Sequence, residues 1–193
     1  MIGKIFITSS GYDPQLGKQV KDPYLGTDPT LGACRPDVRR QLNKGDHIFV
    51  ISGKVRGVQQ FVMGGFEIES KIDVREAYDR FPELRLRKLP SGEIDGNIIV
   101  DAEGKQHRLD HHDHKTFDRR IKNYVVGKNL LTLDTEDQIA EGRQQTLPIL
   151  CDVFQKNGNS PFEVVGHYGT RMTEKQIYKL REWLAEIKGT PAK

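Results

Sequence analysis

The segment from residue 35 to residue 68 constrains the fold of this chain most strongly, because it contains the signals of a complete supersecondary unit. A short basic helix begins at Pro36 and ends at the stop signal Asn43-Lys44-Gly45. The run HIFVIS at 47–52 is too short for a helix and rich in β-branched and aromatic residues, and a second apolar run, QQFVMGGFEI at 59–68, follows after a loop. The segment therefore predicts a helix, a Gly-Asp turn, a strand, a loop and a second strand.

The rest of the chain predicts a mixture of strands and helices without a regular βαβ rhythm. Further strands are expected at 4–8, at 122–127, at 162–169 and as a hairpin at 97–109. Helices are expected at 73–81, at 135–142, at 146–158 and at 173–188. Thr135 with Gln138, and Thr173 with Gln176, have the spacing of a capping box. The pattern fits an α+β fold with a small mixed or antiparallel β-barrel and flanking helices.

Length and composition predict one domain over residues 1–193. No apolar stretch approaches the ~20 residues that span a bilayer, so no membrane partner is expected. The opening residues are typical of a first strand and not of a secretion signal, and the two distant cysteines, Cys34 and Cys151, read as free thiols of a reducing, cytoplasmic compartment. The glycine motifs of dinucleotide-binding and P-loop proteins do not occur at a strand-to-helix junction, and no cofactor is expected.

The order of motifs in the first seventy residues resembles a known family. DPYLGTDPTLGACRPDVRR, at 22–40, precedes the Gly-Asp turn and the strand at 47–52. This order resembles the EVE-like members of the PUA superfamily and, more narrowly, the nucleotide-modification-associated domains. The resemblance implies a PUA-type barrel that binds a modified base in nucleic acid, or a modified nucleotide, in a pocket at the barrel rim. It also implies partners in phage-defence or DNA-modification systems.

Candidate ligand contacts lie at the ends of the expected elements. With the resemblance, the expected ligand-binding residues are Ser9, Ser10, Tyr12, Asp13, Cys34, Arg35, Ser52 and Gly53. The expected contacts to nucleic-acid phosphates are Arg39, Arg40, Lys54 and Arg56. Tyr12 would stack on an extruded base in a slot between the tail of the first strand and the turn after Phe49. The residues alone leave open an ordinary polar turn and a solvated face of mixed charge.

A histidine-rich segment, LDHHDHKTFDRR at 109–120, forms the most conspicuous chemical cluster. His112 and His114 would share one face of a strand, which makes them candidate metal ligands. The alternative function is therefore a metal-dependent nuclease or nucleotide-processing enzyme that uses His111–His114. Acid–base catalysis, a contact to a nucleobase and a plain polar loop also stay open. A binding module is favoured over an enzyme.

Overall fold

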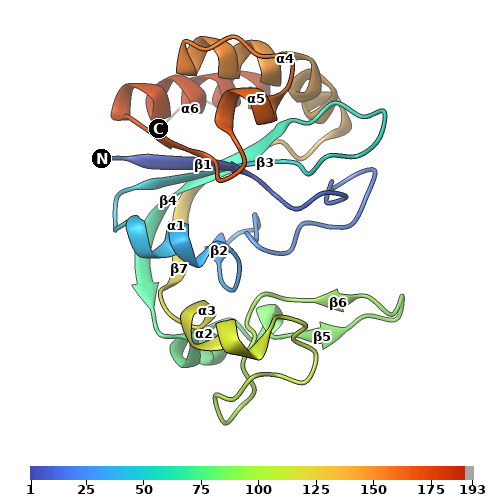
Figure 1. Cartoon of the computed structure of the whole chain (residues 1–193), viewed down its shortest axis with the longest axis vertical. Helices are drawn as coiled ribbons and strands as arrows, with labels where there is room; N and C mark the ends of the chain where they lie inside the picture. The colour runs from blue at the N-terminus through green and yellow to red at the C-terminus, as the bar shows by residue number, and fades with distance from the viewer. Residues whose placement is uncertain (190–193) are drawn as a thin grey trace. The chain divides into compact units, whose positions relative to one another are not determined.

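A computed structural model describes residues 1–189, which divide into two compact units (Figure 1). Unit 1 comprises Met1–Val20, Gly45–Glu67 and the segment from Asn129 onward, and unit 2 comprises Lys21–Lys44 and Ile68–Lys128. The two units are compact parts of the described chain, and the single domain predicted over 1–193 stays a prediction. The expected mixed α+β class is confirmed.

The strands of unit 1 pair in both parallel and antiparallel directions. Its strands are β1 (Gly3–Ile7), β3 (His47–Ile51), β8 (Thr170–Met172) and the parts of β4 (Val62–Ile72) and β7 (Tyr124–Thr132) that belong to it. Their order is β7-β4-β3-β1-β8. β1 runs parallel to β3 and antiparallel to β8, and β3 runs antiparallel to β4. Every residue of β3 is buried, as its unbroken apolar sequence predicts for a central strand.

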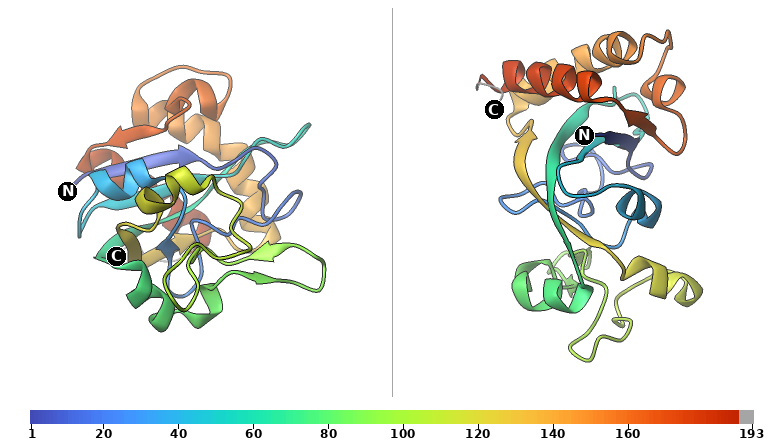
Figure 2. Two further views of the ribbon diagram at one scale, coloured as in Figure 1. Left: turned by 60° about the horizontal axis from the view of Figure 1, so that its bottom comes forward. Right: turned by 90° about the vertical axis from the view of Figure 1, so that its left-hand side faces the viewer.

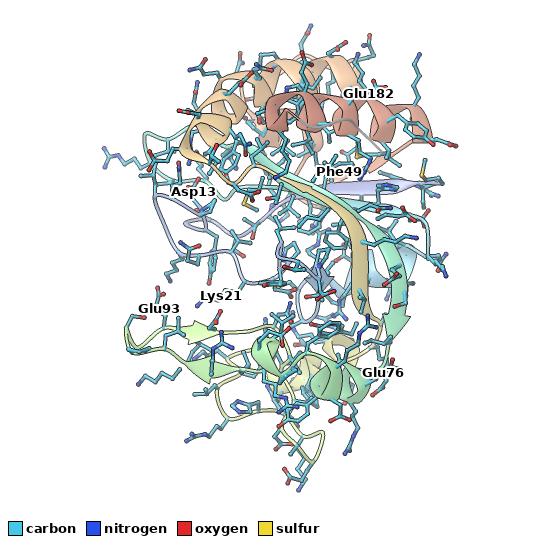
Figure 3. The ribbon with its side chains drawn as sticks, turned by 180° about the vertical axis from the view of Figure 1, so that it is seen from behind. Asp13, Lys21, Phe49, Glu76, Glu93 and Glu182 are labelled. Atoms are coloured by element: carbon cyan, nitrogen blue, oxygen red, sulfur yellow. The ribbon has the colours of Figure 1, made fainter. Side chains whose placement is uncertain are left out.

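Three helices complete unit 1: α4 (Glu136–Phe154), α5 (Pro161–Val165) and α6 (Glu174–Lys188). They lie on one face of its strands, and α4 and α6 run side by side (Figure 2). Both predicted capping boxes are confirmed, at the start of α4 and at the start of α6. Phe49 lies in the interior beneath this helical layer, whereas Glu182 stands on its outer side (Figure 3).

Two expectations for unit 1 are wrong. The strand expected at 162–169 is instead the helix α5 and a turn, because Ser160 caps the helix and Pro161 occupies its first position. The separate helices expected at 135–142 and 146–158 form the single helix α4. Thr146 does not start a helix: its buried hydroxyl accepts the N–H of Val62 at 2.9 Å, which ties the middle of α4 to β4.

Unit 2 has shorter elements. Its strands are β2 (Thr30–Leu31), β5 (Arg87–Lys88), β6 (Ile94–Asp95) and the parts of β4 and β7 that belong to it. Its helices are α1 (Pro36–Gln41), α2 (Val74–Arg80), η1 (Pro82–Leu84), η2 (His114–Thr116) and α3 (Phe117–Arg120). The strand order is β2-β7-β4, and β5 pairs with β6. An apolar core collects Ala33, Val74, Ala77, Phe81, Leu84, Ile98, Ile99, Val100, Phe117, Tyr124 and Val126. The hairpin expected at 97–109 is reduced to one bridge, between Val100 and Gln106.

The strand order ends at β8 in unit 1 and at β2 in unit 2. The described residues thus form a mixed β-sheet with helices, as predicted for the fold class, whereas the predicted barrel stays a prediction. Within residues 1–189, no helix combines the length and the apolarity that crossing a bilayer requires.

Candidate functional site

The tail of β1 and the turn after β3 lie side by side, as the sequence predicted, but the main chain joins them directly. The N–H of Gly53 donates to the carbonyl of Tyr12 at 2.6 Å, and the N–H of Gly11 donates to the carbonyl of Lys54 at 3.0 Å. A Cβ added at Gly53 would lie 2.0 Å from the carbonyl oxygen of Ser9. The two segments are therefore in contact, and the slot expected between them for a flat heterocycle is absent.

Asp13 has a structural role in this region. It is fully buried, and its carboxylate forms an ion pair with Arg143 at 2.8 Å and accepts the N–H groups of Gln15 and Leu16 at 3.0 and 3.2 Å. Burial by itself raises the pKa of Asp13. The hydrogen bonds and charge of Arg143 and the hydrogen bonds of the two main-chain N–H groups outweigh burial, so the pKa falls below its ordinary value of 3.8. A buried carboxylate with these partners does not face a ligand.

Ser52 and Tyr12 do not form the expected base pocket. Ser52 is fully buried, and its hydroxyl accepts the N–H of Phe61 at 3.1 Å. Tyr12 is half-buried, and the ammonium of Lys18 lies 5.9 Å from the centre of its ring. The predicted residues that stay available in this part of unit 1 are the exposed Ser9, Ser10, Lys54 and Arg56.

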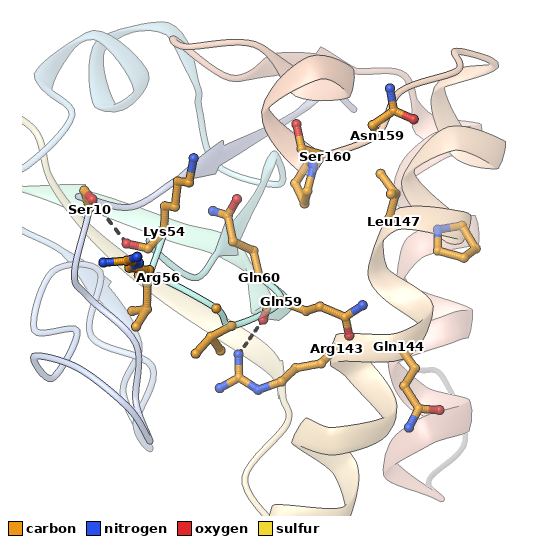
Figure 4. A pocket seen from close by; sticks show the side chains of 15 residues that line it. Ser10, Lys54, Arg56, Gln59, Gln60, Arg143, Gln144, Leu147, Asn159 and Ser160 are labelled. Atoms are coloured by element: carbon orange, nitrogen blue, oxygen red, sulfur yellow. Dashed lines mark hydrogen bonds between the residues drawn. The ribbon is translucent and has the colours of Figure 1, made fainter.

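An open groove of about 710 Å³ lies beside this junction, wholly within unit 1 (Figure 4). We call it the basic groove, and its lining comprises Ser10, Lys54, Val55, Arg56, Gly57, Val58, Gln59, Gln60, Arg143, Gln144, Leu147, Pro148, Asn159, Ser160 and Pro161. Three lining residues are cationic, several carry amides or hydroxyls, and none of these described residues is acidic. The arrangement suits an anionic ligand with hydrogen-bonding edges.

The loop after β3 forms one wall of the basic groove, α4 forms the opposite wall, and the start of α5 forms a third side (Figure 4). Arg143 is held in place: besides its ion pair with Asp13, it donates to the carbonyl of Gln59 at 2.6 Å, and its guanidinium lies 4.7 Å from the ring centre of Phe61. Lys54 and Arg56 are exposed and form no ion pair among the described residues. They are the groove's available cations.

In unit 2, the prediction that Arg39 contacts phosphate is wrong. The side chain of Arg39 is fully buried. Its guanidinium donates to the main-chain carbonyls of Ala33, Cys34, Arg120, Lys122 and Asn123. Arg39 therefore fastens α1 to the segment that precedes β7, which is a structural role. Arg40, the next residue, is exposed.

Cys34 and Arg35 are also engaged within unit 2. Burial, followed by the negative charge of Asp22, raises the pKa of the Cys34 thiol far above its ordinary value, so the thiol stays protonated. Arg35 forms a two-point contact with the carboxylate of Asp37, at 3.0 and 2.7 Å. Neither the protonated Cys34 thiol nor the ion pair of Arg35 with Asp37 identifies a ligand site.

Asp22 is a structural residue that the sequence interpretation missed. Its carboxylate accepts the main-chain N–H groups of Gly32, Ala33 and Cys34 and the side-chain amide of Asn97. Asn97 in turn donates to the hydroxyl of Thr30 and accepts the hydroxyl of Tyr124. This hydrogen-bond network fixes the loop before α1. A local sequence pattern cannot predict the network, because its members lie far apart in the chain.

The histidine-rich segment is an irregular loop followed by η2 and α3, and not a strand. Nδ1 of His112 lies 2.6 Å from Asp110, and Nδ1 of His114 lies 2.7 Å from the side chain of Gln106. Gln106 also donates to Asp110 at 2.8 Å, so these polar groups bind one another and shape the loop. Asp113 caps η2. Within the described chain, no group of three or more His, Cys, Asp or Glu side chains is placed to hold a metal ion.

No family model, curated protein or solved structure matches this chain. Sequence reasoning found Ser10, Lys54 and Arg56 among the lining residues and missed Arg143 and Gln144. These two lie on the polar face of a helix, where basic and amide residues are ordinary solvent contacts.

Proposed function

We propose that this chain is a nucleic-acid or nucleotide binding module whose basic groove holds the phosphate groups of its ligand. The observation that carries the proposal is the lining of the groove: two exposed cations without an ion-pair partner among the described residues, Lys54 and Arg56, and a set of amides and hydroxyls, with no carboxylate among the described lining residues. Such a surface attracts polyanions, because its cations attract phosphate groups and no carboxylate of the described lining repels them.

The cationic and the amide side chains of the lining would bind different parts of the ligand. Lys54 and Arg56 are exposed cations, and a guanidinium can donate two parallel hydrogen bonds to a phosphate. Gln60, Gln144 and Asn159 carry both donors and acceptors, which is what the edges of bases and the hydroxyls of sugars require. Phosphate contacts would position the ligand, and the amides would contribute selectivity.

Recognition of a modified base, and membership of the EVE-like branch of the PUA superfamily with its barrel, are the finer parts of the proposal. Their support is the order of motifs in the first seventy residues. Extrusion of a base from a duplex costs a few kcal/mol, so a single strand or an already unpaired base is the easier ligand. Proteins of phage-defence or DNA-modification systems are the partners that the resemblance implies.

The proposal is tested by fluorescence anisotropy with labelled single-stranded DNA and RNA, with and without a modified base, at several salt concentrations. With one phosphate neutralised by each of the two available cations, log K for a single strand is expected to fall with log salt at a slope of about −1.4. Lys54→Ala and Arg56→Ala should each weaken binding and flatten this slope.

Lys175→Ala is the matched control, because Lys175 is an exposed lysine on α6, outside the basic groove. It should leave both affinity and slope unchanged. Absence of binding at low salt, or an equal effect of the control and groove variants, would refute the proposal. Equal affinity for modified and unmodified strands would remove only its finer part.

A further inference from the structure

Three aromatic side chains gather on the surface of unit 1 directly after the residues that line the basic groove. They are Phe162 on α5 and His167 and Tyr168 in the turn between α5 and β8, and we call them the aromatic cluster. Phe162 is 51% exposed, Tyr168 is 74% exposed, and His167 is exposed as well. Single exposed rings are common on protein surfaces, whereas a contiguous group of them marks an interaction site.

The rings of the aromatic cluster touch one another. His167 lies edge-on to both neighbours, with ring centres 6.3 Å from Phe162 at an angle of 71° and 4.8 Å from Tyr168 at an angle of 83°. Edge-to-face contact is a favourable arrangement for aromatic pairs. The cluster is therefore one continuous aromatic surface.

The turn that carries two of these rings is braced by the fold. Gly166 and Gly169 both have positive φ, of 74° and 72°, and a Cβ added at Gly169 would lie 2.2 Å from the carbonyl oxygen of Ile5. The hydroxyl of Thr170 donates to the carbonyl of Val165 at 2.7 Å. Since folding already fixes the turn, a ligand need not order it, which favours binding.

The aromatic cluster begins at the residue that directly follows the lining of the basic groove in the chain. Pro161 lines the groove, and Phe162 is the next residue, so their Cα atoms lie about 3.8 Å apart. The carboxylate closest in sequence, that of Glu163, accepts the N–H of Asn159 at 2.9 Å and so binds the start of its own helix. Aromatic rings beside cations form the combination with which proteins hold single-stranded nucleic acids.

We propose that the bases of a single-stranded nucleic acid stack on the aromatic cluster while its phosphates occupy the basic groove. This inference rests on the proposed function and narrows the ligand to a strand of several nucleotides. Stacking on an aromatic side chain tolerates every base, because every base has a π-face. The amides of the groove remain available for selectivity.

The test compares two labelled single strands of about ten residues, one of thymidines and one of abasic sites that keeps the phosphates and lacks the bases. The wild-type chain is expected to bind the thymidine strand more tightly, by about tenfold for each stacked base. Phe162→Ala and Tyr168→Ala should each weaken binding of the thymidine strand by about tenfold and leave the abasic strand unaffected.

Tyr178→Ala is the matched control, because Tyr178 on α6 is 54% exposed and lies outside the aromatic cluster and the groove. It should change the affinity for neither strand, whereas Lys54→Ala should weaken both. Thermal melts check that the three ring variants stay folded.

Equal wild-type affinity for the two strands, with both weakened by Lys54→Ala, would overturn the stacking and leave the proposed function standing. An effect of Tyr178→Ala as large as that of Phe162→Ala would also overturn it. Absence of binding to both strands would overturn the stacking and the proposed function together.

Discussion

His47 shows how a single buried side chain makes the stability of unit 1 depend on pH. It is 5% exposed, and its Nδ1 has no hydrogen-bond partner among the described residues. Burial, followed by the positive charge of Arg181, lowers its pKa from 6.5 to about 4, although Glu67 and Asp46 act in the opposite direction. The folded chain therefore holds this imidazole neutral over a range in which the unfolded chain protonates it.

We expect His47 to stabilise the fold fully above pH 6.5 and to lose this contribution as the pH falls to about 4, since the unfolded state binds the extra proton. The loss is on the order of 3 kcal/mol across this window. Urea denaturation at pH 7 and pH 4 measures it, with His47→Gln as the neutral comparison. The difference in unfolding free energy between the two pH values should shrink in the variant, and an unchanged difference would contradict the expectation.

Arg39 and Lys54 show what residue identity alone can and cannot predict. Both were expected to reach phosphate, and both are basic residues near a helix or strand end. One is fully buried and one is exposed, because main-chain carbonyls from distant segments surround Arg39. Two of these carbonyls, those of Arg120 and Lys122, come from positions 81 and 83 residues later in the chain. No local pattern reveals such a pairing.

At the scale of elements, signals confined to one or two turns predicted well. The capping boxes at Thr135 and Thr173 mark the observed helix starts, because a cap needs only four consecutive residues. The predicted strand at 162–169 is wrong because Ser160 and Pro161 start a helix there, and this start signal outweighs the short apolar run that follows it. The basic groove could not be predicted whole, because its walls come from three separate segments.

The close contact between β1's tail and the turn after β3 gives a prediction for the element scale. Gly53→Ala places a Cβ against two main-chain carbonyls, 2.0 Å from that of Ser9 and 2.8 Å from that of Tyr12. Neither carbonyl can move without breaking its hydrogen-bonded surroundings, so we expect a loss of about 3 kcal/mol in unfolding free energy, measured by urea denaturation.

Gly57→Ala is the comparison for Gly53→Ala. Its Cβ meets nothing within 4 Å, but its φ of +75° is strained for alanine. That strain is expected to cost about 1 kcal/mol. If Gly53→Ala proved no more destabilising than Gly57→Ala, the direct junction of the two segments would be wrong.

For the whole molecule, a ligand that binds only the folded chain must raise its stability. At a ligand concentration of about 100 times Kd, the free energy of unfolding is expected to rise by about 2.7 kcal/mol. Thermal denaturation with and without a single-stranded oligonucleotide measures this rise. The Lys54→Ala variant at the same ligand concentration should show a smaller rise, because its affinity is lower.

Lys175→Ala is again the control, and its melting temperature should shift with ligand as the wild type's does. A stabilisation that persisted undiminished in Lys54→Ala would place the ligand elsewhere than in the basic groove.

The pairing of β1 with both β3 and β8 affects how the nascent chain acquires its structure. Gly3 pairs with Met172, so β8 reaches β1 only after residue 172 has been synthesised and has left the ribosome. Until then, the edge of β1 that β8 will cover has no partner in its own chain, and unpaired strand edges invite association with other chains. We therefore expect production of this protein to benefit from chaperones and from slow translation at low temperature.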